Sequence, residues 1–368
     1  MKRVTGTVAA FAAFALSACG GGGDASPGAM KQKQQSSAAG GTVTLTGAGA
    51  SFPRPIYDRW FTDYAAANPV RVNYQAIGSG GGIRQVTEGT VDFGASDAPM
   101  SQEELAKAPG MVHVPTVLGA VTIAYNLPGL AQPLRLDGAT LAGIFGGTIK
   151  KWNDPAIAAL NPGVQLPATD VIPVHRTDGS GTTFIFTEYL GAVSPQWKQG
   201  VGVGKTVNWP AGLGGKGNEG VTGQVKQTPG AVGYVELAYA REGNLPTAAV
   251  RNAAGQFVQP SVEATTAAAA NLQLGADGDL RASLVNLPGA QTYPIVAWTY
   301  LLVPPHMQDC TRARALAGLV RWSLTEGAAT ARELHYAPLP DAVRAPALAA
   351  MDGVTCGPNR ERVDAART

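Results

Sequence analysis

The chain has 368 residues, a formal net charge of +2 at pH 7 and only 15% charged residues. Such a weak charge gives no electrostatic footprint for binding nucleic acid or another acidic polymer. The part of the chain from residue 42 to residue 368 is long enough for two domains.

The N-terminal segment has the pattern of an export signal. Two basic residues precede a short apolar run over residues 8–16, and a Leu-Ser-Ala-Cys sequence ends at Cys19. The run is too short to span a bilayer, which takes about 20 apolar residues, so residues 1–18 are predicted to be a secretory signal peptide. The Leu-Ser-Ala-Cys sequence resembles a bacterial lipobox. We therefore expect Cys19 to be lipidated and to be the only membrane anchor.

A flexible linker is expected next. Residues 20–41 are rich in Gly, Ser and Gln and show no hydrophobic period, so they have no face to bury. Lipidated Cys19 and this linker together occupy residues 19–42 in our prediction, and a short C-terminal tail is expected over residues 357–368.

The two other cysteines are Cys310 and Cys356. With Cys19 assigned to lipid, they are an even pair in an oxidising compartment. The sequence therefore predicts a disulfide between them.

The body of the chain opens with a strand, a glycine-rich turn and a helix. A β-prone run over residues 42–46 leads into a turn at residues 47–53, where a proline suits the first turn of a helix. Apolar residues then recur at helical spacing. They are Ile56, Tyr57, Trp60, Phe61 and Tyr64.

The same pattern returns further along the chain. A strand is predicted at residues 70–74, a glycine-rich loop at 78–82 and a helix start at 83–88, and a short strand with a small-residue turn follows at 91–100. Repeated turns of this kind predict an α/β chain that contacts its ligand at the carboxyl ends of its strands.

The stretch from His175 to Thr183 is the third strand-to-helix turn. Its two glycines permit a tight loop with positive φ or close backbone approach, and its hydroxyl residues suit a helix cap. The free N–H groups of a helix start bind anions, and Arg176 adds a planar set of donors. Ser51, Ser79 and Ser180 from the three turns could then converge on one anion. The alternative is a surface loop in which Arg176 pairs with Asp178.

Other patterns do not support a nucleotide or metal site. Residues 212–217 fit a dinucleotide glycine motif but follow no predicted strand, and residues 204–206 lack the first glycine of a phosphate-binding loop. The four histidines are scattered singly without ligand spacing. We expect no metal and no cofactor.

Several motifs, taken together, resemble the periplasmic phosphate-binding protein of the phosphate-specific ABC transporter, a solute-binding lipoprotein family. The resemblance runs in order from about residue 43 to about residue 345. The motifs lie at residues 47–53, 73–79, 91–99, 150–152, 178–182, 212–218, 229–236 and 334–340.

The resemblance implies a phosphate site made of uncharged donors, one cation and one carboxylate. Asp97 would accept the ligand's proton, and Arg176, oriented by Asp178, would be the cation. Two departures are that Ser51 stands where Thr is familiar and His175 where a second Arg occurs. The implied binding residues are Ser51, Phe52, Ser79, Asp97, Arg176, Ser180, Gly181 and Thr182.

The resemblance also implies the fold: α/β, two-lobed, of the type II periplasmic-binding-protein class. Its lobes would be discontinuous, with residues 43–118 and 297–356 in lobe I and residues 119–296 in lobe II. Two strand-like runs, 114–125 and 293–303, would form the hinge between them.

The function implied is high-affinity capture of inorganic phosphate and delivery to ABC permease subunits in the inner membrane. We expect an exported, monomeric, non-enzymatic lipoprotein at the periplasm or cell surface. Two alternatives are a secreted phosphatase on the same scaffold and a binder of another tetrahedral oxyanion such as sulfate. A phosphatase requires a nucleophile or metal pair, and the sequence shows no clustered His and carboxylate residues for it.

Overall fold

The computed structural model describes residues 41–130, 132–272 and 279–363, which belong to one compact unit beginning at Gly41. The predicted signal peptide, Cys19 and nearly all of the predicted linker lie outside the described residues, as does the end of the predicted C-terminal tail. Within the described residues, no helix is long and apolar enough to cross a membrane.

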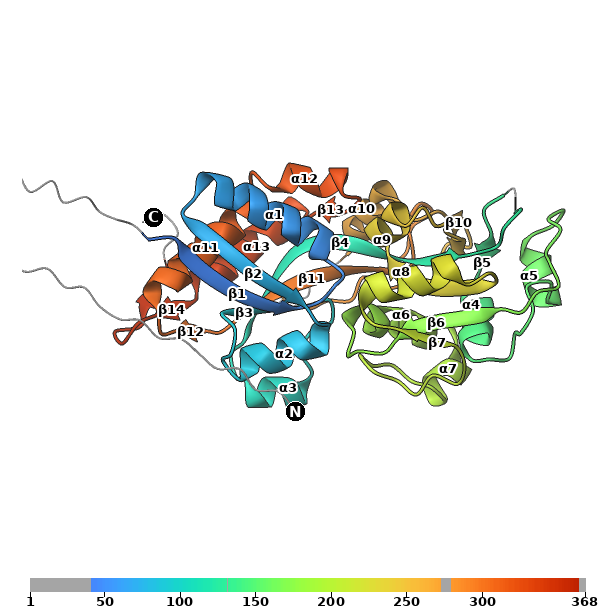
Figure 1. Ribbon diagram of the computed structural model, residues 1–368, viewed down its shortest axis with the longest axis horizontal. Coiled ribbons are helices and arrows are strands. Elements are labelled where there is room, and N and C mark those ends of the chain that lie inside the picture. The colour runs from blue at the N-terminus through green and yellow to red at the C-terminus, as the bar shows by residue number, and fades with distance from the viewer. Residues whose placement is uncertain (1–40, 131, 273–278, 364–368) are drawn as a thin grey trace, which may run out of the picture. The chain divides into compact units, whose positions relative to one another are not determined.

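Strands and helices alternate along the described chain, as an α/β fold requires (Figure 1). The strands are β1 (Val43–Gly49), β2 (Val70–Ala76), β3 (Phe93–Ser96), β4 (Val112–Tyr125), β5 (Arg135–Leu136), β6 (Ile172–Arg176), β7 (Leu213–Gly215), β8 (Ala231–Glu236), β9 (Ala249–Arg251), β10 (Phe257–Val258), β11 (Val296–Val303), β12 (His306–Met307), β13 (Ala337–Pro338), β14 (Thr355–Cys356) and β15 (Glu361–Arg362). The helices are α1 (Arg54–Ala67), α2 (Ser79–Thr87), α3 (Gln102–Lys107), α4 (Gly138–Phe145), α5 (Pro155–Leu160), α6 (Gly181–Val193), α7 (Pro195–Gln199), α8 (Gly217–Gln227), α9 (Leu237–Glu242), α10 (Val262–Ala270), α11 (Cys310–Leu324), α12 (Ala328–Glu333) and α13 (Asp341–Asp352).

The main sheet of the described residues runs β2-β1-β3-β11-β4-β8-β6-β7, with β13 beside β4. Strands β1, β2 and β3 are parallel, and so are β6, β7 and β8. The antiparallel pair β4 and β11 joins these two groups. The result is a two-lobed α/β fold with one parallel group in each lobe.

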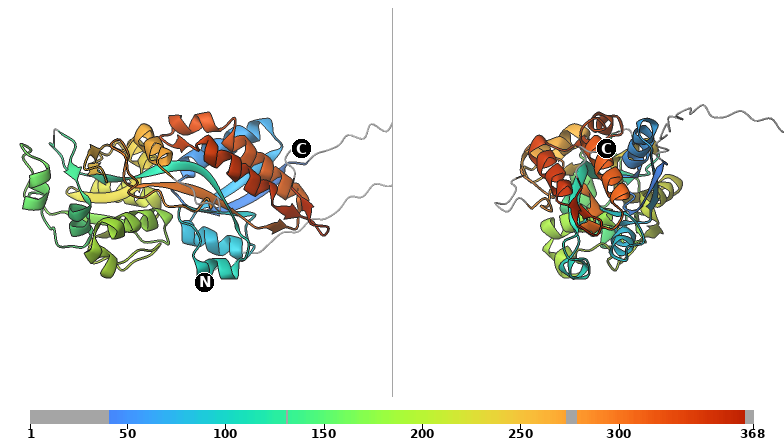
Figure 2. Two further views of the ribbon diagram at one scale, coloured as in Figure 1. Left: turned by 180° about the vertical axis from the view of Figure 1, so that it is seen from behind. Right: turned by 90° about the vertical axis from the view of Figure 1, so that its left-hand side faces the viewer.

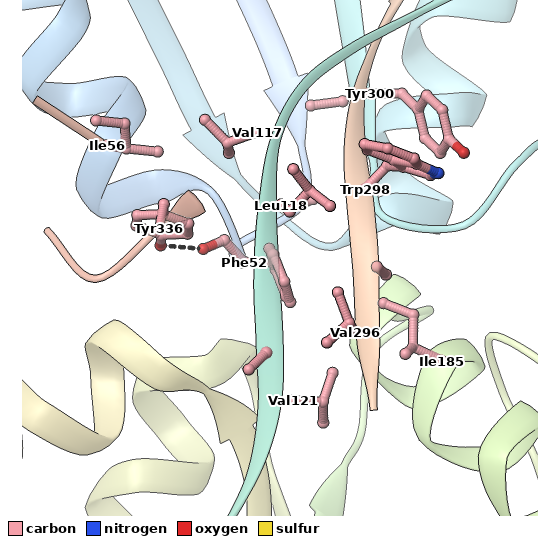
Figure 3. Packing of buried hydrophobic residues seen from close by; sticks show 14 of the residues in the cluster. Phe52, Ile56, Val117, Leu118, Val121, Ile185, Val296, Trp298, Tyr300 and Tyr336 are labelled. Atoms are coloured by element: carbon pink, nitrogen blue, oxygen red, sulfur yellow. Dashed lines mark hydrogen bonds between the residues drawn. The ribbon is translucent and has the colours of Figure 1, made fainter. Parts of the chain in front are cut away.

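Strand β4 passes from one group to the other. Its first part pairs with β11 and its last five residues pair with β8. Almost every residue of β4 and all of β11 are buried, which explains why both are largely apolar in sequence and show no polar alternation. Figure 3 shows their side chains packing against Phe52 and Ile185 from the two sides. The strand prediction for both runs is confirmed, while the hinge role and the lobe boundaries stay predictions.

Helices cover the sheet. Helix α1 buries the five apolar residues predicted from their spacing and packs beside β2. Helices α11 and α13, orange and red in Figure 2, pack against each other, and α13 lies against β4. Cys310, the first residue of α11, forms the predicted disulfide with Cys356 on β14.

The second predicted helix begins earlier than expected. The loop predicted at residues 78–82 is a loop only at its first residue, because α2 starts at Ser79. Gly82 permits close packing of this helix against β1, since a Cβ there would lie 2.5 Å from the carbonyl oxygen of Ala48.

Candidate functional site

Four strand-to-helix turns meet at one place, at the carboxyl ends of β1, β2, β6 and β7. Ser51 follows β1, Ser79 begins α2, Thr182 lies in the first turn of α6, and Asn218 lies in the first turn of α8. Each of these side chains is at most 1% exposed. The start of a helix leaves backbone N–H groups unpaired, so this arrangement directs several donors toward a common point.

Hydrogen bonds connect these turns across the site. Ser79 Oγ accepts from the backbone N–H of Gly181 at 3.0 Å and from that of Asp97 at 3.3 Å. Ser51 Oγ accepts from the backbone N–H and from Nδ2 of Asn218, both at 3.0 Å. Asn218 Nδ2 also donates to Thr182 Oγ1 at 3.2 Å. The hydroxyl and amide groups of both lobes therefore form one network.

Gly181 permits the closest of these approaches. A Cβ at this position would lie 2.6 Å from both Ser79 Oγ and Asp97 Cβ, so a larger residue would push the two lobes apart here. The glycine is used for close approach and not for positive φ, which neither Gly179 nor Gly181 adopts. Ser180 caps α6 as predicted, because its Oγ accepts from the N–H of Thr183 at 3.0 Å.

Arg176 ends β6, and its side chain is 1% exposed. Its Nε and Nη2 donate to the two carboxylate oxygens of Asp178 at 2.8 and 2.5 Å, and its Nη1 donates to Thr182 Oγ1 at 3.3 Å. Asp178 also accepts from the N–H of Gly217 at 3.0 Å. Burial alone would raise the pKa of Asp178, but the hydrogen bond and charge of Arg176 outweigh it and hold that pKa below its ordinary value. The pair fixes the guanidinium with one edge toward Thr182.

Asp97 follows β3 and is 3% exposed. Its Oδ1 accepts from Thr299 Oγ1 of β11 at 3.0 Å, and its Oδ2 lies 3.5 Å from Thr182 Oγ1. Burial raises the pKa of Asp97 to about 7, although Thr299, Arg176 and Thr182 all favour the charged form. Asp97 does not cap the next helix, because Ser101 caps α3.

The structure brings the predicted binding residues together in this network. Phe52 is fully buried, and its carbonyl accepts from the Tyr336 hydroxyl at 2.6 Å. The alternative of a surface loop around Arg176 is excluded by burial, although the Arg176–Asp178 pair that it assumed is present. Direct contact of each residue with a ligand stays a prediction.

Two buried residues of this network were missing from the sequence prediction. Asn218 directly follows the stretch at residues 212–217 that fits a dinucleotide glycine motif. There, β7 and the start of α8 repeat the strand, glycine turn and helix pattern of the other three turns. That repeated pattern could have predicted a site residue at Asn218. Thr299 lies inside an apolar strand and gave no such signal.

The chemistry of the network suits a small oxyanion. Hydroxyl, amide and helix N-terminal donors surround a single buried guanidinium, and Asp97 supplies an acceptor. Among the described residues, no group of three or more His, Cys, Asp or Glu side chains is placed to hold a metal ion.

Comparisons with known proteins agree in sequence and in fold. A family model described as a PBP superfamily domain matches residues 34–326. The phosphate-binding protein PstS of Xylella fastidiosa strain Temecula1 is 47% identical over 81% of this chain and 82% of its own length. The PstS protein of Pasteurella multocida is 48% identical over 82% and 87%, and that of Methanocaldococcus jannaschii is 37% identical over 88% and 87%.

Solved structures share the fold at low sequence identity. A high-affinity periplasmic phosphate-binding protein bound with phosphate aligns with a TM-score of 0.69 and 22% identity, over 83% of this chain and 93% of that one. A phosphate-binding protein from Stenotrophomonas maltophilia aligns with a TM-score of 0.65 and 23% identity over the same shares.

Proposed function

Because the chain belongs to the PstS phosphate-binding proteins of the PBP superfamily, we propose that it binds inorganic phosphate in the network around Arg176 and delivers it to an ABC-type importer. The observation that carries this proposal is Asp97, a buried carboxylate among donors that otherwise suit an anion. Phosphate keeps a hydrogen at neutral pH and can donate it to Asp97, whereas sulfate has none and meets a like charge.

The ligand shell that we propose follows from the contacts described above. Arg176, oriented by Asp178, supplies the positive charge, and the donors come from both lobes. Asn218 joins the predicted set, since its amide donates to two of the hydroxyls. The full set is Ser51, Phe52, Ser79, Asp97, Arg176, Ser180, Gly181, Thr182 and Asn218.

Isothermal titration calorimetry tests this function directly. Phosphate is expected to bind tightly with one site per chain, and an excess of sulfate is expected to leave that titration unchanged. Equal binding of both anions would contradict the role of Asp97, and no heat with either would contradict the function.

We infer that the protein acts at the periplasm or cell surface, since one solved structure of the same fold is a periplasmic phosphate-binding protein. We further infer that Cys19 is lipidated and anchors an otherwise monomeric protein to a membrane. Mass spectrometry of the mature N-terminus and of a Cys19→Ala variant tests the anchor, because the variant is expected to lose the lipid mass and partition into the aqueous phase. Sedimentation of that soluble variant tests the monomer.

The protein is a solute-binding protein in our proposal, not a phosphatase. The named relatives are binding proteins. Incubation with a chromogenic phosphate monoester is expected to release no phosphate above buffer.

A further inference from the structure

Glu236 is a buried carboxyl group beside the phosphate network that has no place in the proposed ligand shell. It ends β8, has no exposed surface, and its backbone N–H donates to Asn218 Oδ1 at 2.9 Å. Its Oε2 accepts from the N–H of Ala238 at 2.7 Å, in the first turn of α9. Its Oε1 is buried and has no hydrogen-bond partner among the residues that the structure describes. A buried carboxylate oxygen left unpaired is costly, so the state of this group needs an explanation.

The group opposite is the Tyr336 hydroxyl. Tyr336 precedes β13, is fully buried and is close enough to the Glu236 carboxyl to interact with it. Figure 3 shows this hydroxyl beside β4, donating to the carbonyl of Phe52 at 2.6 Å. A tyrosine hydroxyl has one hydrogen, and here it is used by Phe52. Tyr336 therefore has only lone pairs to offer Glu236.

The two partners fit only if the carboxyl group supplies the hydrogen. An ionised carboxylate and an oxygen lone pair are both acceptors, but a protonated carboxyl can donate. A neutral Glu236 would complete a continuous chain from its own O–H through Tyr336 to the Phe52 carbonyl. The Phe52 peptide belongs to the proposed ligand shell, so this chain ends at the phosphate site.

The charges around Glu236 agree with a neutral acid. Helix α9 presents Tyr239 and Glu242, β4 presents Gly119, whose added Cβ would lie 3.1 Å from Oε1, and α8 presents Asn218. Burial, and to a lesser extent the charge of Glu242, raises the pKa of Glu236 well above its ordinary value, although the backbone N–H groups of Ala238 and Leu237 favour the charged form. The cations Arg54 and Arg176 act on the neighbouring Tyr239.

We propose that Glu236 is a positioning residue of the phosphate site: as the neutral acid it donates to Tyr336, which holds the Phe52 peptide, while its backbone N–H orients the Asn218 amide. The proposal rests on phosphate binding at this network. Glu236 then affects phosphate affinity through Phe52 and Asn218, without contacting the ligand. Ionisation of Glu236 removes the donated hydrogen and places two acceptors against each other.

Infrared difference spectroscopy on the ligand-free protein tests the protonation state. In an Asp97→Asn background, which removes the protonated-carboxyl signal of Asp97, the spectrum at neutral pH is expected to contain a protonated-carboxyl band that disappears when Glu236→Gln is added. Glu242→Gln, an exposed glutamate on the same helix, is the matched control and is expected to keep the band. An unchanged band in Glu236→Gln would overturn the proposal. Because phosphate is absent, this result does not depend on the proposed function.

Phosphate titrations test the coupling. Glu236→Gln keeps a neutral donor and is expected to bind within about 3-fold of the unmodified protein, whereas Glu236→Leu and Tyr336→Phe should each lose about 10-fold, the worth of one good hydrogen bond. The double variant should lose about 10-fold as well, because both changes break one chain. If the affinity losses of the two single variants multiplied in the double variant, the proposal would be overturned. Native phosphate affinity in Glu236→Leu would overturn it as well. If Glu236→Leu fails to fold, the infrared band and the Gln variant decide.

Discussion

The Arg176 guanidinium is buried and yet remains able to bind an anion. A guanidinium with almost no exposed surface needs a partner, and Asp178 occupies two of its donors while Nη1 stays directed at Thr182. The carboxylate reduces the cost of burying the cation before any ligand is bound. It also sets the plane of the guanidinium, so fewer side-chain rotations are lost on binding.

Removal of this cation is expected to weaken phosphate binding strongly. Arg176→Ala leaves the anion without a buried positive partner and Asp178 without its own, which should cost about 2–5 kcal/mol, or roughly 30-fold to several thousandfold in affinity. Calorimetry with Arg59→Ala, an exposed arginine paired with Asp63, provides the control and should show no loss. Near-native binding by Arg176→Ala would refute its assigned role.

Local pattern and chemistry alone predicted only part of the site, whereas Phe52 and Asp97 were implied by the family resemblance. Ser51, Ser79 and Ser180 stand in glycine-rich turns before helices, and a turn of that kind has few other structures available. Thr299 had no such marker, because a threonine in a β strand is ordinary. Its role depends on a bond to Asp97, which lies 202 positions away in the chain. Distant pairings of this kind are set by the packing of β3 on β11 and not by local preference.

At the scale of elements, the same unit is used four times. A parallel strand ends, a glycine turn follows, and a helix begins with its N–H groups directed at the site. The boundaries of α2 were missed because glycine disfavours helices in isolation, while tertiary packing against β1 requires it. Strand β13, with two residues, has too little sequence to show a period at all.

The disulfide stabilises elements that have little sheet structure of their own. Cys310 begins α11, and Cys356 lies on the two-residue strand β14. The bridge closes a loop with a sequence separation of 46, which contributes about 4 kcal/mol on the chain-entropy model. Replacing both cysteines by alanine is therefore expected to lower the free energy of unfolding in urea by about that amount. A reducing agent should have the same effect on the unmodified protein and none on the double variant; equal stability of the two proteins would contradict this account.

At the scale of the whole molecule, the site exists only where the lobes meet. Gly80 N–H donates to the Gly179 carbonyl at 2.9 Å, and Lys205 pairs with Glu104 at 2.6 Å, each joining the two sides. The contact between the lobes also buries Asp97, because its carboxylate contacts Thr299 of β11 and Thr182 of α6. Asp97 is buried only in the folded molecule. Its raised pKa therefore affects how both folding stability and anion selectivity depend on pH.

The first consequence concerns stability without ligand. Because burial raises the pKa of Asp97 from 3.8 to about 7, the folded chain holds a proton that the unfolded chain releases, so stability falls as pH rises between these values. Asp97→Asn lacks this term. The variant should match the unmodified protein at about pH 3.5 and exceed it by up to roughly 4 kcal/mol at about pH 8. Thermal unfolding across this range measures the difference; a constant difference would show that Asp97 titrates normally.

The second consequence concerns selectivity. Above about pH 7 the Asp97 carboxylate is ionised; it repels sulfate and accepts the hydrogen of phosphate. As pH falls through that value the carboxyl becomes neutral and can itself donate to a sulfate oxygen, so sulfate should compete with phosphate better at about pH 5 than at about pH 8. Asp97→Asn cannot ionise and should show sulfate competition that is stronger at about pH 8 and nearly independent of pH. Competition titrations at both pH values measure the effect. Asp63→Asn, which removes a surface carboxylate, is the control for a general effect of charge. An unchanged phosphate-to-sulfate ratio in Asp97→Asn would contradict this account, because the remaining donors around Arg176 cannot distinguish two tetrahedral anions by their hydrogens and another acceptor would have to do so.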